Sequence, residues 1–287
     1  MKTLSDPTVN TAGKIAETVT SLGKLLLQSR PVGKYPAAVK NKPLIILGNG
    51  PSLRNAIDNH SDILTSNPTL AVNFAANTPE FRQIKPTYYV LADPVFFNPE
   101  GNSQVRKLIE SINTIDWEMT LFIPRKENFK TNNPNLKICR FNMVGIEGNS
   151  ILEKYAFRHK LGMPRPRNVL IPSIMIGIWC GYKNIVICGA DHSWTETLRV
   201  DKENRVVSIQ PHFYAENEKE TERISQVYSN VRLHHILHSF YVAFRAYHSI
   251  RQFADSNGIR ILNATPDSFI DAFERKALEY INFYSRS

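Results

Sequence analysis

Cysteine is scarce in this sequence of 287 residues, which holds only Cys139, Cys180 and Cys188 and no C-x-x-C spacing. So few cysteines argue against a disulfide framework and against a cysteine-rich metal site. Cys139 and Cys188 lie within apolar runs typical of strands, and Cys180 ends an apolar run typical of a helix. We therefore expect three inert, buried thiols in a reducing compartment.

Long apolar runs are also lacking. No stretch reaches the roughly 18–20 apolar residues that a membrane-spanning helix needs. Near the N-terminus, Asp6, Lys14 and Glu17 interrupt the apolar residues, so a secretory signal peptide is not expected. Together these absences predict a cytoplasmic protein.

Motifs for nucleic-acid binding are missing, although the chain is basic. It has 35 Lys and Arg against 26 Asp and Glu, a net charge of +9, but the basic residues are dispersed. No zinc-finger, helix-turn-helix or RNP-type sequence accompanies them, so nucleic acid is not an expected partner. The positive excess instead favours phosphate-bearing ligands or an anionic membrane surface.

Short apolar runs alternate with helical patterns from residue 43 onwards. The predicted strands are 43–47, 69–73, 87–92, 119–123, 136–141, 184–188 and 259–263, and the predicted helices include 102–113, 149–161, 171–180 and 234–256. This alternation predicts an α/β fold in which a mainly parallel sheet carries helices on both faces. Residues 43–287 would form one Rossmann-like nucleotide-binding catalytic domain, with the polar stretch 195–226 as a lid.

The first 42 residues read as a separate N-terminal segment. Apolar residues at helical spacing within 9–28, such as Ile15, Val19 and Leu22, predict an amphipathic helix, and 30–42 reads as a linker. The helix either packs on the body of the domain or contacts a membrane surface peripherally. Nearby basic residues such as Lys24 would assist the second arrangement.

The most informative stretch follows the first predicted strand and consists of Gly48, Asn49, Gly50, Pro51 and Ser52. Glycine lets a ligand approach the backbone, while proline and serine signal the start of a helix. Free N–H groups at such a turn would bind an anion. The stretch matches neither the P-loop nor the G-x-G-x-x-G pattern. A tight turn without a ligand is the alternative.

Polar residues also end three other predicted strands. Asn73 ends the second, Asp93 the third, and Asp191 with His192 follows the strand at 184–188. Ligands of open α/β sheets bind beyond the carboxyl ends of the strands, so these residues would converge with the glycine turn on one crevice. The two carboxylates would hold a divalent metal or hydrogen-bond ribose hydroxyls, or else act only as caps.

A histidine cluster lies on the last long predicted helix. His238 shares a helix face with His234 and His235 through spacings of four and three residues. The cluster would hold a structural metal, remain solvated, or supply a general base, because histidine titrates near neutral pH.

Taken in order along the chain, these motifs resemble the bacterial CMP-sialic acid-dependent sialyltransferases of glycosyltransferase family 42. The likeness covers about residues 43–270 and rests on Ile45–Leu53, Val72-Asn73, Asp93–Phe97, Gly181–Asp191, His238-Ser239 and Pro266–Ser268. It implies a Rossmann-like variant with a lid and chemistry without a metal. A CMP-activated acidic sugar would be transferred to a glycan acceptor in surface polysaccharide biosynthesis. That acceptor would be lipid-linked if the protein works at the inner membrane face.

The resemblance also implies roles for single residues. Asn73 and the glycine turn would contact the donor phosphate, Asp93 and Asn168 would lie near the nucleotide, and His238 would deprotonate the acceptor hydroxyl. The family's tyrosines on the leaving phosphate have no match after Asp191, so His192 or, from the lid, Tyr214 or His212 would take their place. The oligomeric state stays open, with a homo-oligomer among the alternatives.

A second resemblance gives a different activity. Archaeal-type 6-hydroxymethylpterin pyrophosphokinases and their relatives share the Gly-x-Gly-Pro-Ser-Leu turn and an aspartate at the position of Asp191. That reading implies diphosphate transfer from ATP, with Mg²⁺ held by Asp93 and Asp191.

Overall fold

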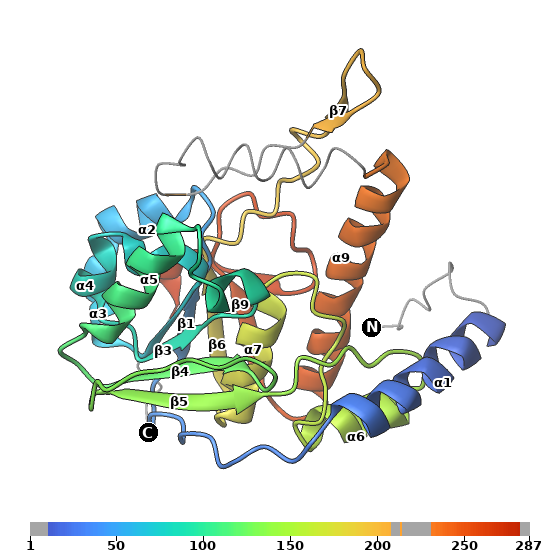
Figure 1. Cartoon of the computed structure of the whole chain (residues 1–287), viewed down its shortest axis with the longest axis horizontal. Coiled ribbons are helices and arrows are strands. Elements are labelled where there is room, and N and C mark those ends of the chain that lie inside the picture. Colours follow the sequence, from blue (N-terminus) through green and yellow to red (C-terminus); the bar gives the residue numbers. More distant parts are fainter. Residues whose placement is uncertain (1–10, 208–212, 214–230, 282–287) are drawn as a thin grey trace.

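The computed structural model describes residues 11–207, 213 and 231–281. Its centre is an eight-stranded sheet of order β10-β9-β6-β1-β2-β3-β4-β5, in which every neighbouring pair is parallel (Figure 1). The strands are β1 (Leu44–Leu47), β2 (Thr69–Val72), β3 (Tyr88–Val90), β4 (Met119–Pro124), β5 (Leu136–Phe141), β6 (Asn184–Cys188), β9 (Arg260–Asn263) and β10 (Glu274–Arg275). The predicted Rossmann-like α/β fold is confirmed.

The strand order turns round at β1. Strands β2 to β5 follow β1 on one side in chain order, and the chain then returns so that β6 pairs with the other side of β1. Strands β1 to β4 are buried along their whole length, and β6 and β9 are buried after their first residue, which explains why these strands read as short apolar runs without alternation. The place between β1 and β6 is therefore a topological switch point, where open α/β sheets bind their ligands.

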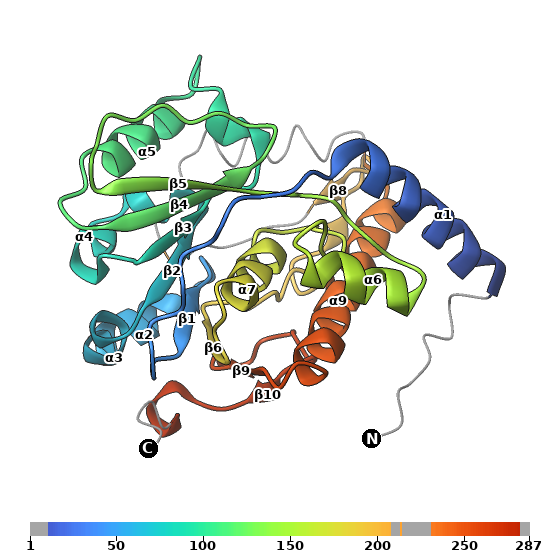
Figure 2. The ribbon, with the colours of Figure 1, turned by 90° about the horizontal axis from the view of Figure 1, so that it is seen from below.

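Helices cover both faces of the sheet (Figure 2). Leu44 and Ile46 point to one face and Ile45 and Leu47 to the other, because successive side chains of a strand alternate. The helices are α2 (Leu53–Asn59), α3 (Ser61–Ser66), α4 (Glu80–Ile84) and α5 (Ser103–Asn113) on one face, and α6 (Ser150–Arg158), α7 (Leu170–Trp179) and α9 (Leu233–Asp255) on the other. Every residue of α7 is buried, as its unbroken apolar sequence requires.

The N-terminal helix α1 (Thr11–Gln28) packs on the body through its polar face. The Arg245 guanidinium of α9 donates to Glu17 Oε1 at 2.9 and 3.0 Å and also bonds Glu147. Ser21, the only buried residue of α1, exchanges hydrogen bonds with the backbone of Glu147, 2.9 Å each way. The predicted helix is confirmed, and of the two arrangements the sequence left open it adopts packing on the body, with its polar side inward.

The polar excursion after β6 begins with a small antiparallel hairpin of β7 (Arg199–Val200) and β8 (Val206–Val207), which protrudes from the body (Figure 1). Residues 208–212 and 214–226 of the predicted lid lie outside the described residues, and Tyr214 and His212 are among them. Phe213 is described, and its backbone N–H donates to the carbonyl oxygen of Asn49 at 3.0 Å. This hydrogen bond ties the excursion to the glycine turn.

The three thiols are free, as expected. Cys180 and Cys188 are buried, and burial raises the pKa of each to about 12. Cys139 is half-buried, and burial raises its pKa as well. Within the described residues, no helix is both long enough and apolar enough to cross a bilayer.

We expect Gly148→Ala to loosen α1. Gly148 has φ +107°, and an added Cβ would lie 2.7 Å from Thr18 N and 2.9 Å from Lys14 O, both backbone atoms of α1. Overpacking of this kind costs about 1–3 kcal/mol, so hydrogen exchange of residues 11–28 should accelerate while the sheet stays protected. Gly101→Ala is the matched control, since it also has positive φ but open space around it. Unchanged exchange in α1 would contradict the docking through this glycine.

Candidate functional site

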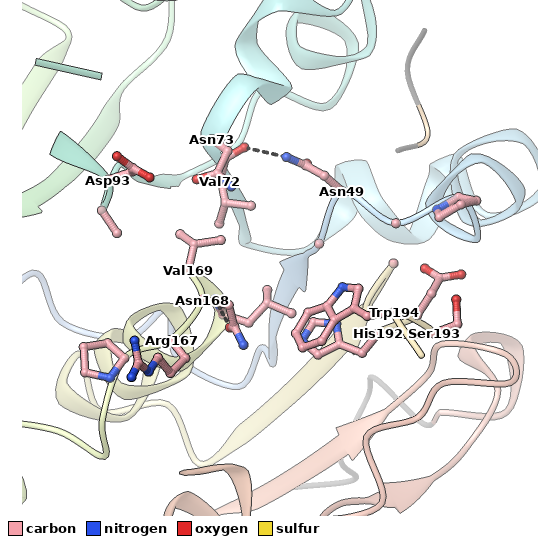
Figure 3. Close-up of a pocket in the computed structure, with 18 of the residues that line it drawn as sticks. Asn49, Val72, Asn73, Asp93, Arg167, Asn168, Val169, His192, Ser193 and Trp194 are labelled. Carbon is pink, nitrogen blue, oxygen red and sulfur yellow. Dashed lines mark hydrogen bonds between the residues drawn. The ribbon is translucent and has the colours of Figure 1, made fainter. Parts of the chain in front are cut away.

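A cavity of about 460 Å³ lies beyond the carboxyl ends of β1, β2, β3 and β6, at the switch point of the sheet (Figure 3). Its lining includes nine of the residues that the sequence singled out: Gly48, Asn49, Gly50, Pro51, Asn73, Asp93, Asn168, Asp191 and His192. Five loops that are remote in sequence thus meet at one place. The predicted convergence of strand ends on one crevice is what the geometry shows.

The glycines of the turn are required by the neighbouring strand. The N–H groups of Gly48 and Gly50 donate to the carbonyl oxygens of Cys188 and Gly189, each at 2.8 Å. A Cβ on Gly48 would lie 2.8 Å from the Gly189 carbonyl carbon, and one on Gly50 would lie 2.8 Å from the Gly189 oxygen. The expectation that these N–H groups are free for an anion is wrong, because the end of β6 uses them.

Asp191 completes this contact. Its Oδ1 accepts from the Ser52 N–H at 3.2 Å, and its Oδ2 accepts from the Ser52 hydroxyl at 2.8 Å. The carboxylate therefore occupies the place that a phosphate would take at the start of α2. Ser52 itself is not among the residues that line the cavity. Asp191 acts as a clamp between the ends of β1 and β6.

Two residues at the cavity have left-handed backbones. Asn73 has φ 51° and His192 has φ 54°, and each directly follows the end of a strand or its turn. Asparagine and histidine are among the non-glycine residues that adopt this conformation most often. Such conformations persist where the surrounding structure holds them, and they cluster at functional sites. The side chains of both residues line the cavity (Figure 3).

A hydrogen-bond chain fixes the state of His192. The Tyr247 hydroxyl donates to Asn168 Oδ1 at 3.0 Å, so its oxygen accepts from His192 Nε2 at 2.7 Å. Burial lowers the pKa of His192 to about 3, which leaves the imidazole neutral near pH 7. With the proton on Nε2, His192 Nδ1 is an acceptor. Burial also raises the pKa of Tyr247 far above its usual value, so the hydroxyl keeps its proton.

Two amide atoms at the cavity lack a partner within the described residues. Asn168 Oδ1 caps α7 by accepting from Leu170 N at 3.0 Å, but its buried Nδ2 has no acceptor. Asn49 Nδ2 donates to Val72 O at 3.2 Å, while its buried Oδ1 has no donor. A buried polar group without a hydrogen bond costs about 1–3 kcal/mol. Both residues line the cavity, so a small shift of either side chain would present an unpaired donor or acceptor to a ligand.

Charge is sparse in the cavity lining. Arg167 is its single cationic side chain, and it is exposed, with no ion pair recorded among the described residues. Asp93 is exposed at the end of β3, where its Oδ1 caps a short 3-10 turn by accepting from Val95 N at 2.9 Å. With Asp191 clamped and His192 neutral, the cavity suits a ligand of low negative charge.

An aromatic wall closes one side. Trp194 stacks on His192 with ring centroids 4.1 Å apart and an interplanar angle of 30°. Its other neighbours are Phe240 and Phe244 of α9, at 5.2 and 6.0 Å. The wall joins the cavity to α9 and to the base of the β7–β8 hairpin.

The structure differs from the sequence-based prediction of the site in two ways: the predicted general base lies outside the cavity, and three residues at the site were not predicted. His238 is exposed on α9, its ring 6.1 Å from that of Tyr241, and it is not among the residues that line the cavity. Conversely, Arg167, Trp194 and Tyr247 were not singled out. The only signal for Arg167 and Trp194 is that each adjoins or nearly adjoins a predicted site residue. Tyr247 lies mid-helix and gives no local signal.

The described part of the chain holds no group of three or more His, Cys, Asp or Glu side chains placed for a metal ion. His234 and His235 of the histidine cluster are both exposed, and their ring centroids lie 4.0 Å apart with the planes tilted by 48°.

No protein-family model and no curated protein sequence matches the chain. Among solved structures, the chain is similar to the MAf glycosyltransferase from Magnetospirillum magneticum AMB-1, with a TM-score of 0.51 and 9% sequence identity. The alignment covers 94% of this chain but only 39% of that longer protein. At this identity the likeness concerns the fold alone.

The low pKa of His192 predicts an acid-side loss of stability. The unfolded histidine takes up a proton as the pH falls through about 6.5, whereas the folded one stays neutral down to about pH 3. The free energy of unfolding therefore falls between these values, by at most about 1.4 kcal/mol per pH unit. His192→Gln removes the histidine and with it this pH dependence. The difference in free energy of unfolding between wild type and variant, measured by urea titration, should therefore become smaller from pH 7 to pH 4.

The control is the same substitution at the exposed His234, which lies outside the cavity lining, and the two variants are compared with the wild type over the same pH range. Parallel curves for wild type and His192→Gln over this range would show that the folded histidine is not held neutral.

Proposed function

We propose that this protein is a glycosyltransferase that takes an acidic sugar from a CMP-linked donor and places it on a glycan acceptor. The observation that carries the proposal is the cavity at the switch point, with the unpartnered Asn168 Nδ2 and Asn49 Oδ1 at its wall. The fold likeness to a protein that is itself described as a glycosyltransferase supports the same class.

The charge of the cavity supports a CMP donor over a triphosphate. A CMP-linked sugar acid carries one phosphodiester charge and one carboxylate, whereas ATP carries about four negative charges near neutral pH. Among the described residues of the lining, Arg167 is the one cation, opposed by Asp93 and by the clamped Asp191. One guanidinium can bind a phosphodiester or a carboxylate through paired hydrogen bonds. Trp194 offers the base or the sugar an aromatic face.

In this reaction the acceptor hydroxyl oxygen bonds to the anomeric carbon of the sugar. The bond from that carbon to the phosphate oxygen breaks, and CMP departs with the bonding electrons. A base takes the hydroxyl proton. His192 Nε2–H already bonds Tyr247, so this histidine would position the donor from its Nδ1 or its ring and would not act as an acid. Asn73 projects into the cavity from β2 and would bind the donor phosphate or sugar.

Two residues compete for the role of base. Asp93 lines the cavity with Oδ2 uncommitted by its cap, whereas His238 lies on the exposed side of α9. For His238 to act, the acceptor must extend from the cavity to α9.

The metal-dependent alternative requires Asp93 and Asp191 to share a cation. These residues follow β3 and β6, which are three strand spacings apart, or about 14 Å at about 4.8 Å each. Oxygen ligands bind Mg²⁺ at about 2.1 Å, and both oxygens of Asp191 already accept from Ser52. This arrangement does not fit one shared Mg²⁺, and it favours the CMP-donor reading over the pyrophosphokinase reading.

Nucleotide binding tests the proposal. Melting temperatures should be measured with CMP, UMP, ADP and ATP, each in EDTA and in Mg²⁺. We expect CMP to stabilise the protein equally with and without metal, by about 2.7 kcal/mol at 100 times its Kd. Arg167→Ala should reduce this stabilisation, whereas Lys40→Ala, an exposed cation that precedes β1, should leave it unchanged. Stabilisation by ATP only in Mg²⁺ would reject the proposal in favour of the pyrophosphokinase.

Once a donor is identified by CMP release, Asp93→Asn and His238→Ala separate the two bases. Loss of a general base lowers kcat by about 10²–10⁴-fold. We expect Asp93→Asn to show this loss with little change in CMP affinity, and His238→Ala to keep kcat within a few-fold of wild type. The reverse result would assign the base to His238 and place the acceptor across α9.

A further inference from the structure

Helix α1 carries most of its large apolar side chains on the outside, and Leu25, which packs on the core, is the exception. Ser21 is its only buried residue, whereas five large apolar residues are exposed: Ile15 60%, Val19 64%, Leu22 44%, Leu26 74% and Leu27 77%. An ordinary surface helix does the opposite and turns its apolar stripe to the core. No described residue covers this face, which we call the α1 face.

Ion pairs hold α1 in this orientation, with its apolar residues outward. Glu17 is the only acidic residue of α1, and it points inward to Arg245, at 2.9 Å. Ser21 bonds the backbone of Glu147, whose carboxylate is held by Arg245 and Arg165. The polar side of α1 is therefore fixed by partially buried ion pairs, and its orientation cannot reverse without leaving those charges unpaired.

The exposed residues of α1 include one cation and no carboxylate. The two lysines of α1 are Lys14, which is exposed, and Lys24, which is half-buried. Contiguous exposed apolar surface of this kind marks a site of contact with a protein or a membrane.

The neighbouring helix α6 also exposes apolar and basic side chains. Figures 1 and 2 both show α6 beside α1. Ile151 and Tyr155 are 76% and 54% exposed, with Lys154 and Arg158 exposed between and after them. The one acid of α6, Glu153, is turned inward, and burial raises its pKa to about 7.

We infer that the α1 face binds the surface of an anionic lipid bilayer, with α1 lying in the plane of the interface. Apolar residues would enter the boundary between headgroups and acyl chains, and the lysines and Arg158 would meet the negative headgroups. A second copy of the chain fits less well. A two-fold interface would set this face against itself and would bring cations together with no exposed carboxylate on α1 or α6 to pair them. The inference does not depend on the proposed reaction, because no residue of α1 or α6 lines the cavity.

Vesicle flotation of the full chain tests it. The vesicles are phosphatidylcholine alone and phosphatidylcholine with 30% phosphatidylglycerol. We expect binding to the anionic vesicles, weakened in high salt, and little binding to the neutral ones. Ile15→Gln, Val19→Gln and Leu26→Gln combined should lower the partition coefficient by roughly 100-fold, because the apolar side chains supply most of the transfer free energy. The replaced side chains are exposed, so folding should be preserved, which circular dichroism checks.

The matched control combines Val39→Gln, Val200→Gln and Tyr280→Gln, which remove exposed apolar residues outside α1 and α6 and should leave binding unchanged. Lys14→Glu with Lys154→Glu should weaken binding to anionic vesicles only. Failure of the wild type to bind, or equal loss in both triple variants, would overturn the inference. A dimer that the α1 triple variant converts to monomer, without vesicle binding, would replace it with self-association. None of these measurements involves nucleotide, so their outcome is independent of the CMP test.

Discussion

The close approach of two strand ends organises this molecule. Gly48 and Gly50, after β1, lie against Gly189 at the end of β6 so tightly that a Cβ on Gly189 would be 2.7 Å from Gly48 O and from Leu53 Cβ. Backbone hydrogen bonds at 2.8 Å and the Asp191 clamp on Ser52 hold the two ends together. Because β1 and β6 flank the switch point, this contact sets the floor of the cavity and the position of every loop that follows those strands.

Much of the fold follows from local sequence patterns. The strand at 184–188 and the helix at 103–113 lie within a residue of their predicted bounds, because a short apolar run or a 3.6-residue period fixes each one locally. Strand β10 was not predicted, since it is two residues long and exposed, Glu274 and Arg275. The hairpin of β7 and β8 was missed for the same reason, as two-residue strands carry no usable period.

The site was predictable as a set of strand ends but not in its internal contacts. The sequence placed Asn73, Asp93 and Asp191 at one edge through the topology rule for parallel sheets. It could not show that Asp191 bonds Ser52, which is 139 positions away, or that Tyr247 connects His192 to Asn168. The inward side of α1 was hidden for the same reason, because Glu17 finds its partner Arg245 at a separation of 228 positions. Local patterns decide which residues form an element, and distant partners decide which side of it is buried.

The hydrogen bond from Phe213 N–H to Asn49 O gives the excursion after β6 a thermodynamic link to the cavity. Asn49 is nearly fully buried, and its side chain holds the end of β2 through Val72 O. A ligand that supplies a donor to Asn49 Oδ1 favours one position of this residue, and with it one position of Phe213. By reciprocity, whatever draws Phe213 away from the turn weakens the ligand by the same free energy. The described end of the excursion is thus linked to the cavity through the backbone of Asn49.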